Sequence, residues 1–291
     1  SGPHRHRHGT CRDLITGLRF VLPSGDVVMM GGGCVKNVSG YALEKLLIGS
    51  MGTIGVIVDA TFRTVPLPEV TRALCFSSAG CDDGPGEPIA RLGRELTGAH
   101  LQLAAVEALS PALAFRALGD AGGQQEGGWT LALSLEGLAE EVDYLSRNAT
   151  DLALGLGLTL AATLEGDACD AFWSTVTDVG TPCVQLSAPL SAASELAAGV
   201  VQAVRADSPM RLGLGTGILC VAGEDLDLAS LHALACELGG NARWLAPAPS
   251  GQTTAYLHGP VVEYHRRLKT AYDPQGILPD VGFGLVGGDT Q

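Results

Sequence analysis

The chain lacks any apolar run long enough to cross a membrane. Gly, Ser, Thr or charged residues interrupt every candidate before it reaches the roughly 18 residues that a membrane span requires. Basic residues are also scarce, since 18 Lys and Arg stand against 31 Asp and Glu, a net charge of −13. Nucleic acids and anionic membranes need a basic face, so neither is predicted as a main partner. The 291 residues, 46% apolar, suffice for two domains and a sizeable core.

No Cys-x-x-Cys pair occurs among the eight cysteines, and several of them stand inside apolar runs, where a buried thiol is expected. This pattern predicts a reducing compartment and no iron–sulfur cluster. An initiator Met and a signal peptide are absent as well, because the sequence opens in a loop-like stretch from Ser1 to Thr10. We expect an N-terminally incomplete, cytoplasmic product that reaches the inner membrane, if at all, through partner subunits.

The common nucleotide motifs are missing too. Gly31-Gly-Gly33 is not followed by the Lys-Ser/Thr of a P-loop. The stretch Leu212-Gly-Leu-Gly-Thr-Gly217 has neither the spacing nor the acidic ribose partner of a nicotinamide fingerprint. No Ser-His-Asp or Cys-His grouping can be assembled from the histidines at 232, 258 and 265, which stand on separate predicted elements. A nicotinamide site and hydrolase chemistry are therefore not predicted.

Two sets of polar residues allow more than one interpretation. His4, His6 and His8 alternate with arginines and could bind Ni²⁺ or Zn²⁺ if extended, but a flexible cationic end is favoured, so no metal site is predicted. The carboxylates of Glu136, Glu165 and Asp167 stand at strand or helix ends, where such groups cap and solvate. No catalytic residue is predicted from either set.

What the chain does contain is a glycine-paced turn, Gly49-Ser-Met-Gly52-Thr-Ile-Gly55. It lies between a predicted helix, 41–48, and an almost wholly apolar strand, 54–62, expected to be buried on both faces. Glycines at every third position allow positive φ and let backbone amides approach a flat or charged ligand. A hairpin, with strands at 18–22 and 27–30, precedes the helix.

Beyond residue 70 the pattern changes to alternating strands and helices. Strands are predicted at 129–135, 158–164, 184–190, 211–221 and 242–246, and helices at 138–152, 191–204 and 226–238. This alternation predicts an α+β domain, a layered sheet covered by helices on one face. We expect two domains, 1–70 and 71–291, with a C-terminal helix at 264–272 that returns to the first.

The segment from Gly31 to Glu69 resembles the second half of the FAD-binding domain in the vanillyl-alcohol-oxidase/PCMH-type flavoprotein superfamily. The shared pattern runs Lys-Asn-x-x-Gly-Tyr, then Gly-Ser-x-Gly-Thr-x-Gly. Within it the chain is most similar to the small FAD-binding subunit, or E subunit, of glycolate oxidase (glycolate dehydrogenase) complexes. That similarity rests on the opening Ser1-Gly-Pro3 with Gly9 to Leu14, on an apolar residue at Met51, and on Asp273-Pro-Gln-Gly-Ile-Leu-Pro279.

The resemblance implies FAD as cofactor and assigns residues to it. Ser1, Gly2, Gly9 and Thr10 would line the flavin side. Main-chain groups of the next segment would contact the adenosine end, at Gly52, Thr53, Ile54, Gly55, Val56 and Ile57. For Val56 and Ile57, ordinary strand core is the alternative interpretation.

The implied activity is oxidation of glycolate or a related 2-hydroxy acid to the 2-oxo acid by an FAD-dependent oxidoreductase. Electrons would pass to partner subunits, a larger flavin subunit and an iron–sulfur subunit. The superfamily's domain begins with a further glycine-rich subdomain, so the sequence predicts half a flavin site that alone binds FAD poorly. Relatives also carry a cap histidine motif, where this chain has Leu212 to Gly217. A non-catalytic assembly module with a residual flavin site is therefore the alternative.

Overall fold

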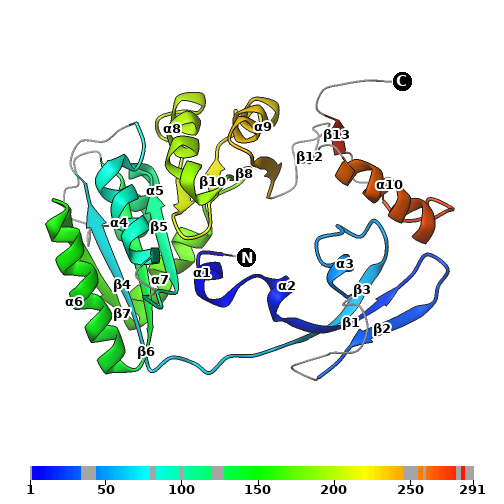
Figure 1. Cartoon of the computed structure of the whole chain (residues 1–291), viewed down its shortest axis with the longest axis horizontal. Helices are drawn as coiled ribbons and strands as arrows, with labels where there is room; N and C mark the ends of the chain where they lie inside the picture. Colours follow the sequence, from blue (N-terminus) through cyan, green and yellow to red (C-terminus); the bar gives the residue numbers. More distant parts are fainter. Residues whose placement is uncertain are drawn as a thin grey trace. The chain divides into compact units, whose positions relative to one another are not determined.

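The computed structural model describes residues 2–33, 44–78, 83–98, 101–119, 128–245, 255–257, 260–279 and 283–285. The chain groups into two compact units, each described separately below (Figure 1). The first unit takes Ser1, Gly9–Pro66 and Thr253–Gln291, and the second takes Gly2–His8 and Leu67–Gln252. Units grouped by contacts do not test which parts fold independently, so the domain limits 1–70 and 71–291 stay a prediction.

The first unit contains an antiparallel sheet of order β2-β1-β3. The predicted hairpin is confirmed, with β1 at Ile15–Val21 and β2 at Val27–Gly31. Its core joins Leu18 and Phe20 of β1 to Leu47 of α3 (Glu44–Leu47) and to Ile54. Alternation along β1 explains this, because Leu18 and Phe20 point to one face while the exposed Arg19 points to the other. The unit also contains α2 (Cys11–Leu14), β12 (Ala255–Leu257), α10 (Pro260–Tyr272) and β13 (Phe283–Leu285).

The strand after the glycine turn, β3 (Val56–Phe62), does not have the burial predicted for it. The sequence indicated a strand covered on both faces, yet Val56 is 50% and Val58 is 53% exposed. Apolar composition reports what a strand can bury and not what covers it. Among the described residues, β3 pairs with β1 alone. Ala60 is the only residue of β3 that packs against the core cluster. The predicted helix at 41–48 is present as α3, while its first three residues lie outside the described ones.

The second unit is built on one antiparallel sheet of order β11-β8-β10-β9-β5-β6-β4-β7. The predicted strand at 211–221 is two strands, because a turn closed by Gly217, at φ 66°, separates them. The strands run as follows: β4 Val70–Ser77, β5 Ala105–Leu109, β6 Thr130–Gly137, β7 Thr159–Glu165, β8 Cys183–Ser187, β9 Met210–Gly213, β10 Ile218–Ala222 and β11 Asn241–Trp244.

Helices cover both faces of this sheet, and not one face as predicted. Arg72 of β4 reaches Ser146 on α6 across one face, with Nη1 2.9 Å from Oγ. Ala73 and Cys75 of the same strand point to the opposite face, where they pack with Phe172 of α7. The α+β class is confirmed. The helices of the unit are α1 Arg5–His8, α4 Gly86–Gly98, α5 Pro111–Leu118, α6 Ala139–Gly155, α7 Gly166–Thr177, α8 Ala193–Ala203 and α9 Leu228–Glu237.

Two expectations from composition can be compared with the structure. Cys75, Cys169, Cys183 and Cys220 are buried free thiols, as their apolar surroundings in the sequence predicted. In the part of the chain that the structure describes, no helix has the length and apolar character needed to span a bilayer.

Candidate functional site

The glycine turn in the first unit folds as a tight turn from Ser50 to Thr53. The Ser50 carbonyl accepts from the Thr53 amide at 3.0 Å and from the Thr53 hydroxyl at 2.7 Å. Both central residues have positive φ, 53° at Met51 and 76° at Gly52. This is the conformation of a type I′ turn, and glycine is the residue that adopts it without strain.

Lys269 on α10 forms a hydrogen bond to this turn. Its Nζ donates to the Thr53 carbonyl at 3.0 Å, to Asp273 Oδ2 at 2.6 Å and to the Leu278 carbonyl at 2.8 Å. The Asp273 carboxylate in turn accepts from the amides of Ile277 and Leu278, both at 2.8 Å. The Lys269 ammonium and these amides lower the pKa of Asp273. The closing Asp-Pro motif of the sequence therefore fixes the C-terminal turn of α10 and, through Lys269, the glycine turn.

Two further cations, Arg12 and Lys45, line a cavity of about 440 Å³ beside the same turn. Arg12 Nη1 donates to the Lys45 carbonyl at 2.7 Å, while Lys45 Nζ donates to the carbonyls of Arg12 and, at 2.6 Å, Ile15. These bonds tie α2 to α3, which ends where the glycine turn begins. The cavity wall also includes Gly49 and Ser50.

The predicted adenosine-side residues lie in one continuous segment, but they do not face the same way. Thr53 and Ile54 are buried, at 0% and 4% exposed, and the Thr53 amide is used within the turn. Among the described residues, no backbone acceptor pairs with the amides of Gly52, Ile54 and Gly55. A Cβ built on Gly52 meets nothing within 4 Å. The open space lies at Gly52 alone, because Ile54 and Gly55 are buried and a Cβ on Gly55 would lie 3.3 Å from Leu47 and Phe20. The backbone at Gly52 therefore has room for a flat or anionic ligand such as part of a dinucleotide.

The last two residues of that set begin β3. Val56 and Ile57 are 50% and 43% exposed, so the alternative interpretation of ordinary strand core is wrong. The exposed side chains of Val56 and Ile57 are accessible to a ligand or to another protein surface.

The predicted flavin-side residues are divided between the two units. Ser1 lies outside the described residues, and Gly2 groups with the second unit, where a Cβ on it would lie 3.5 Å from Thr177. Gly9 has φ 75° and precedes Thr10, whose amide and hydroxyl both donate to Asp13 Oδ2 at 2.7 Å. The Asp13 carboxylate therefore joins the first turn of α2 to Thr10. The roles assigned to these four residues stay predictions.

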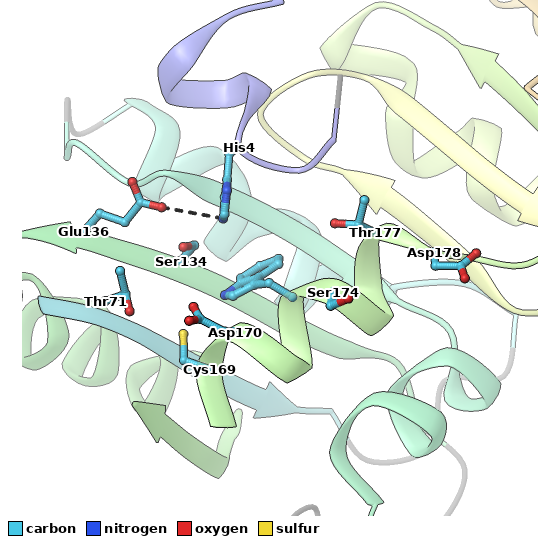
Figure 2. A pocket seen from close by; sticks show the side chains of 10 residues that line it. His4, Thr71, Ser134, Glu136, Cys169, Asp170, Ser174, Thr177 and Asp178 are labelled. Atoms are coloured by element: carbon cyan, nitrogen blue, oxygen red, sulfur yellow. Dashed lines mark ion pairs between the residues drawn. The ribbon is translucent and has the colours of Figure 1, made fainter. Parts of the chain in front are cut away.

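The second unit contains a site that the sequence did not predict, around Glu136 at the end of β6 (Figure 2). His8 Nε2 lies 3.0 Å from Glu136 Oε2, and His4 Nε2 lies 3.7 Å from Oε1. Arg7 Nη1 donates to the Glu136 carbonyl at 2.6 Å. The His8 amide donates to the His4 carbonyl at 3.0 Å, so the two imidazoles stand one helical turn apart.

Two expectations fail here. The segment of His4, His6 and His8 is not a flexible end, because it forms α1 and contacts the sheet. Glu136 is not a solvated cap, since its side chain is only 12% exposed. The available signal was the four-residue spacing of His4 and His8, which puts both rings on one side of a helix. Their partner, more than 120 residues away, could not be read from spacing.

The imidazole of His4 also lies against Trp173 of α7, with ring centroids 5.5 Å apart and planes 56° apart. Burial lowers the pKa of His4, and His8 adds to this effect while Glu136 opposes it. His4, Glu136 and Trp173 line a cavity of about 510 Å³ together with hydroxyls of α7, β4 and β6. A neutral imidazole beside a carboxylate can exchange hydrogen bonds with a ligand hydroxyl. Within the described residues, no group of three or more His, Cys, Asp or Glu forms a metal site.

Another buried pair of ionisable side chains lies on the paired strands β5 and β9. Arg211 Nε of β9 is 3.8 Å from Glu107 Oε2 of β5, with both side chains under 10% exposed. Burial raises the pKa of Glu107 to about 8, although the nearby Arg211 lowers it. The pair contributes an ionisable group inside the sheet that no sequence motif indicated.

Comparison with known proteins finds similarity to FAD-linked oxidoreductases. No family model matches the chain. It is 41% identical over 68 residues to glycolate oxidase subunit GlcD of Bacillus subtilis, covering 23% of this chain and 14% of that protein. It is 35% identical over 74 residues to glycolate oxidase subunit GlcE of Escherichia coli, covering 25% and 21%. An uncharacterized FAD-linked oxidoreductase of Mycobacterium tuberculosis is 25% identical over 306 residues, covering 96% and 66%.

Solved structures share the fold. A glucooligosaccharide oxidase of Acremonium strictum superposes with a TM-score of 0.64 at 12% identity, covering 97% of this chain and 68% of its own. An alkyldihydroxyacetonephosphate synthase gives 0.62 at 13% identity, covering 96% and 55%. The chain therefore spans about half to two thirds of these structures, and only about a seventh to a fifth of the two glycolate oxidase subunits is matched.

Proposed function

We propose that the protein is an FAD-dependent oxidoreductase that takes part in oxidising glycolate or a related 2-hydroxy acid to the 2-oxo acid. The observation that carries this proposal is the Ser50–Thr53 turn, where the backbone at Gly52 faces open space and Lys269 Nζ donates to the Thr53 carbonyl. The relatives support the reaction class, since their names include glycolate oxidase subunits and D-lactate dehydrogenases.

The chain's own part in the reaction is to hold and orient. FAD, when bound, supplies the oxidant that accepts two electrons from the alcohol carbon. The Gly52 amide would donate to its adenosine end, where the absence of a side chain lets the backbone approach. The similarity to GlcD and GlcE extends the proposal to partners: electrons pass to other subunits of a glycolate-oxidase-type complex, which include a larger flavin subunit and an iron–sulfur subunit.

A second candidate is a non-catalytic assembly module. The observation that favours it is an apolar surface on the first unit, where Val27 and Met29 of β2 are 65% and 74% exposed. Exposed large apolar groups on one face of a strand favour contact with another protein surface.

FAD titration of matched glycine variants separates the two candidates. Gly52→Ala adds a methyl group at the open space beside the turn, and Gly25→Ala adds one in the β1–β2 hairpin at a similar φ, 87°, also without a neighbour within 4 Å. Both changes carry the same backbone strain, about 1 kcal/mol. Because the sequence predicts half a flavin site, we expect weak but saturable quenching of flavin fluorescence by the unaltered chain. Gly52→Ala alone should weaken this binding more than about tenfold, which is a loss of some 1.4 kcal/mol.

The two candidates give different results in this experiment. No saturable binding by the unaltered chain, or equal weakening by both variants, would contradict a flavin site at the turn. Binding of a partner subunit that Met29→Lys abolishes, without any binding of FAD, would support the assembly module.

A further inference from the structure

The pocket around His4 and Trp173 contains polar atoms whose hydrogen-bonding capacity is unused. In the described part of the chain, His4 Nε2 and Trp173 Nε1 are shielded from solvent. His4 Nε2 makes no hydrogen bond, and the only acceptor beside Trp173 Nε1 among the described residues is the thiol sulfur of Cys169, which is a weak one. Glu136 Oε1, at 3.7 Å from His4 Nε2, is beyond hydrogen-bond distance. Trp173 is 6% exposed, so its indole N–H has no access to bulk water. Buried polar groups are normally satisfied, and a pair of exceptions lining one cavity indicates a missing partner.

The remaining walls show what kind of partner would satisfy these groups. Ser134 of β6 is 2% exposed and lies at the pocket wall, as do the hydroxyls of Thr71, Ser174 and Thr177 (Figure 2). The indole N–H requires an acceptor oxygen, and hydroxyls can serve as donor or acceptor. A neutral imidazole, which the lowered pKa of His4 favours, accepts from a hydroxyl. A small ligand carrying both a hydroxyl and an acceptor oxygen meets all of these demands.

We propose that this pocket binds the substrate, a small 2-hydroxy monocarboxylate, with its hydroxyl on His4 and a carboxylate oxygen on the Trp173 indole N–H. The choice of ligand class rests on the proposed function. The positions of His4 Nε2 and Trp173 Nε1 in one cavity of about 510 Å³ are observations that do not depend on that function.

The charges around the pocket predict which hydroxy acids it takes. Glu136 lies in its wall, and the exposed carboxylates of Asp170 and Asp178 also line it. The Glu136 carboxylate is hydrogen-bonded to His8 at 3.0 Å, and the Arg7 guanidinium donates to the Glu136 carbonyl, so we expect one ligand carboxylate to be tolerated. A second one would face Asp170 or Asp178. Like charges roughly 4 Å apart in water repel each other enough to weaken binding about three- to tenfold. We therefore expect glycolate and lactate to bind better than 2-hydroxyglutarate.

The test follows the indole N–H signals of the ¹⁵N-labelled chain by NMR. The chain has three Trp residues, so three indole signals are expected, and Trp173→Phe identifies the one from the pocket. We expect glycolate and lactate to shift the Trp173 signal saturably. 2-Hydroxyglutarate should bind about three- to tenfold more weakly, with a smaller difference at high salt because the rim charges are screened. Acetate, which lacks the hydroxyl, should bind several-fold more weakly than glycolate, and His4→Gln should remove that difference.

Trp244→Phe is the matched control. Trp244 on β11 is 5% exposed, its Nε1 also makes no hydrogen bond among the described residues, and it does not line the pocket. Trp173→Phe should weaken glycolate binding while Trp244→Phe leaves it unchanged. Equal effects of the two variants, absence of a saturable Trp173 shift, equal binding of acetate, or tighter binding of 2-hydroxyglutarate would each overturn the inference.

Flavin binding does not enter this readout, so the two proposals fail separately. FAD binding without a Trp173 shift would overturn the pocket and leave the flavin turn standing. A glycolate-dependent shift in a chain that does not bind FAD would support the pocket and contradict the proposed function.

Discussion

Met51 is the residue with the least favourable backbone in the described structure. It is the only described non-glycine residue at positive φ, 53°, and it precedes Gly52 at φ 76°. A left-handed conformation costs a residue with a β-carbon about 1 kcal/mol, and Asn tolerates it better than Met. The side chain is 45% exposed, so packing does not compensate for the strain.

Met51→Asn should therefore stabilise the protein. We expect a gain of about 0.5–1 kcal/mol in the free energy of unfolding, measured by urea denaturation. Met29→Asn is the control, since Met29 lies on β2, is 74% exposed and has ordinary extended backbone. Asn is unfavourable in strands, so this variant should be neutral or slightly destabilising. A gain in both variants would show that the turn is not strained at Met51.

Glu107 is a buried residue whose titration should affect stability. Burial raises its pKa from 4.5 to about 8, so the folded protein holds a proton that the unfolded chain releases above pH 4.5. Between these values the unfolded state binds fewer protons, and the free energy of unfolding falls as pH rises from about 4.5 to 8.

Glu107→Gln should remove this fall. We expect the variant's stability, relative to the unaltered chain, to increase by on the order of 3 kcal/mol between pH 4.5 and 8. Denaturation curves across this pH range measure the difference. A difference that is constant with pH would contradict a raised pKa, and one that declines would mean that Arg211 dominates.

At the scale of elements, α10 is held by charged hydrogen bonds as well as by apolar contact. Lys269 Nζ is 15% exposed and bonds to Thr53, Asp273 and Leu278, and Leu268 packs against the core of β1 and α3. Hydrogen bonds to a shielded charge contribute more than those at the surface, because water does not replace them.

Lys269→Met should cost about 2–4 kcal/mol of stability and increase the flexibility of the glycine turn. Arg91→Met is a matched control, because Arg91 and Glu95 form an i,i+4 pair on α4 that is exposed, at 58% and 37%. Such a pair contributes under about 0.5 kcal/mol. Thermal denaturation compares the two, and amide exchange at Thr53 reports the turn. Equal losses would mean that Lys269 behaves as a surface residue.

The elements also show what sequence patterns can and cannot predict. The hairpin was predictable because Pro23 to Asp26 carries turn residues between short apolar strands. The burial of β3 was not, since its valines have the same composition whether a neighbour covers them or not. The division of 211–221 into β9 and β10 was missed because the turn residues from Leu214 to Gly217 include few polar groups.

At the scale of the whole molecule, the α+β class followed from alternating patterns, whereas the His4–Glu136 site did not. Its members stand at positions 4, 8, 136 and 173, and no local pattern links them. The glycine turn was predictable because all of its residues are contiguous. Sites built by one segment can be read from sequence, but sites that tertiary pairing assembles cannot without the register of the sheet.

The first unit combines two segments separated by the whole of Leu67–Gln252. Ending the chain after Gln252 removes Lys269 from Thr53 and Leu268 from the core cluster. We expect amides of β1 to β3 to exchange faster in such a chain, by mass spectrometry, while β5 and β6 of the second unit keep their protection. Unchanged exchange in β1 to β3 would show that the first segment is stable without α10.

The same connectivity sets an order of events during synthesis. After residue 66 leaves the ribosome, the glycine turn waits for Lys269 while the intervening chain is translated, roughly 10–40 s at 5–20 residues per second. The second unit can fold during that interval from contiguous strands. The nascent first segment meanwhile exposes an apolar strand without its C-terminal helix, which makes it a substrate for chaperones. Cofactor loading is then expected only after translation is complete.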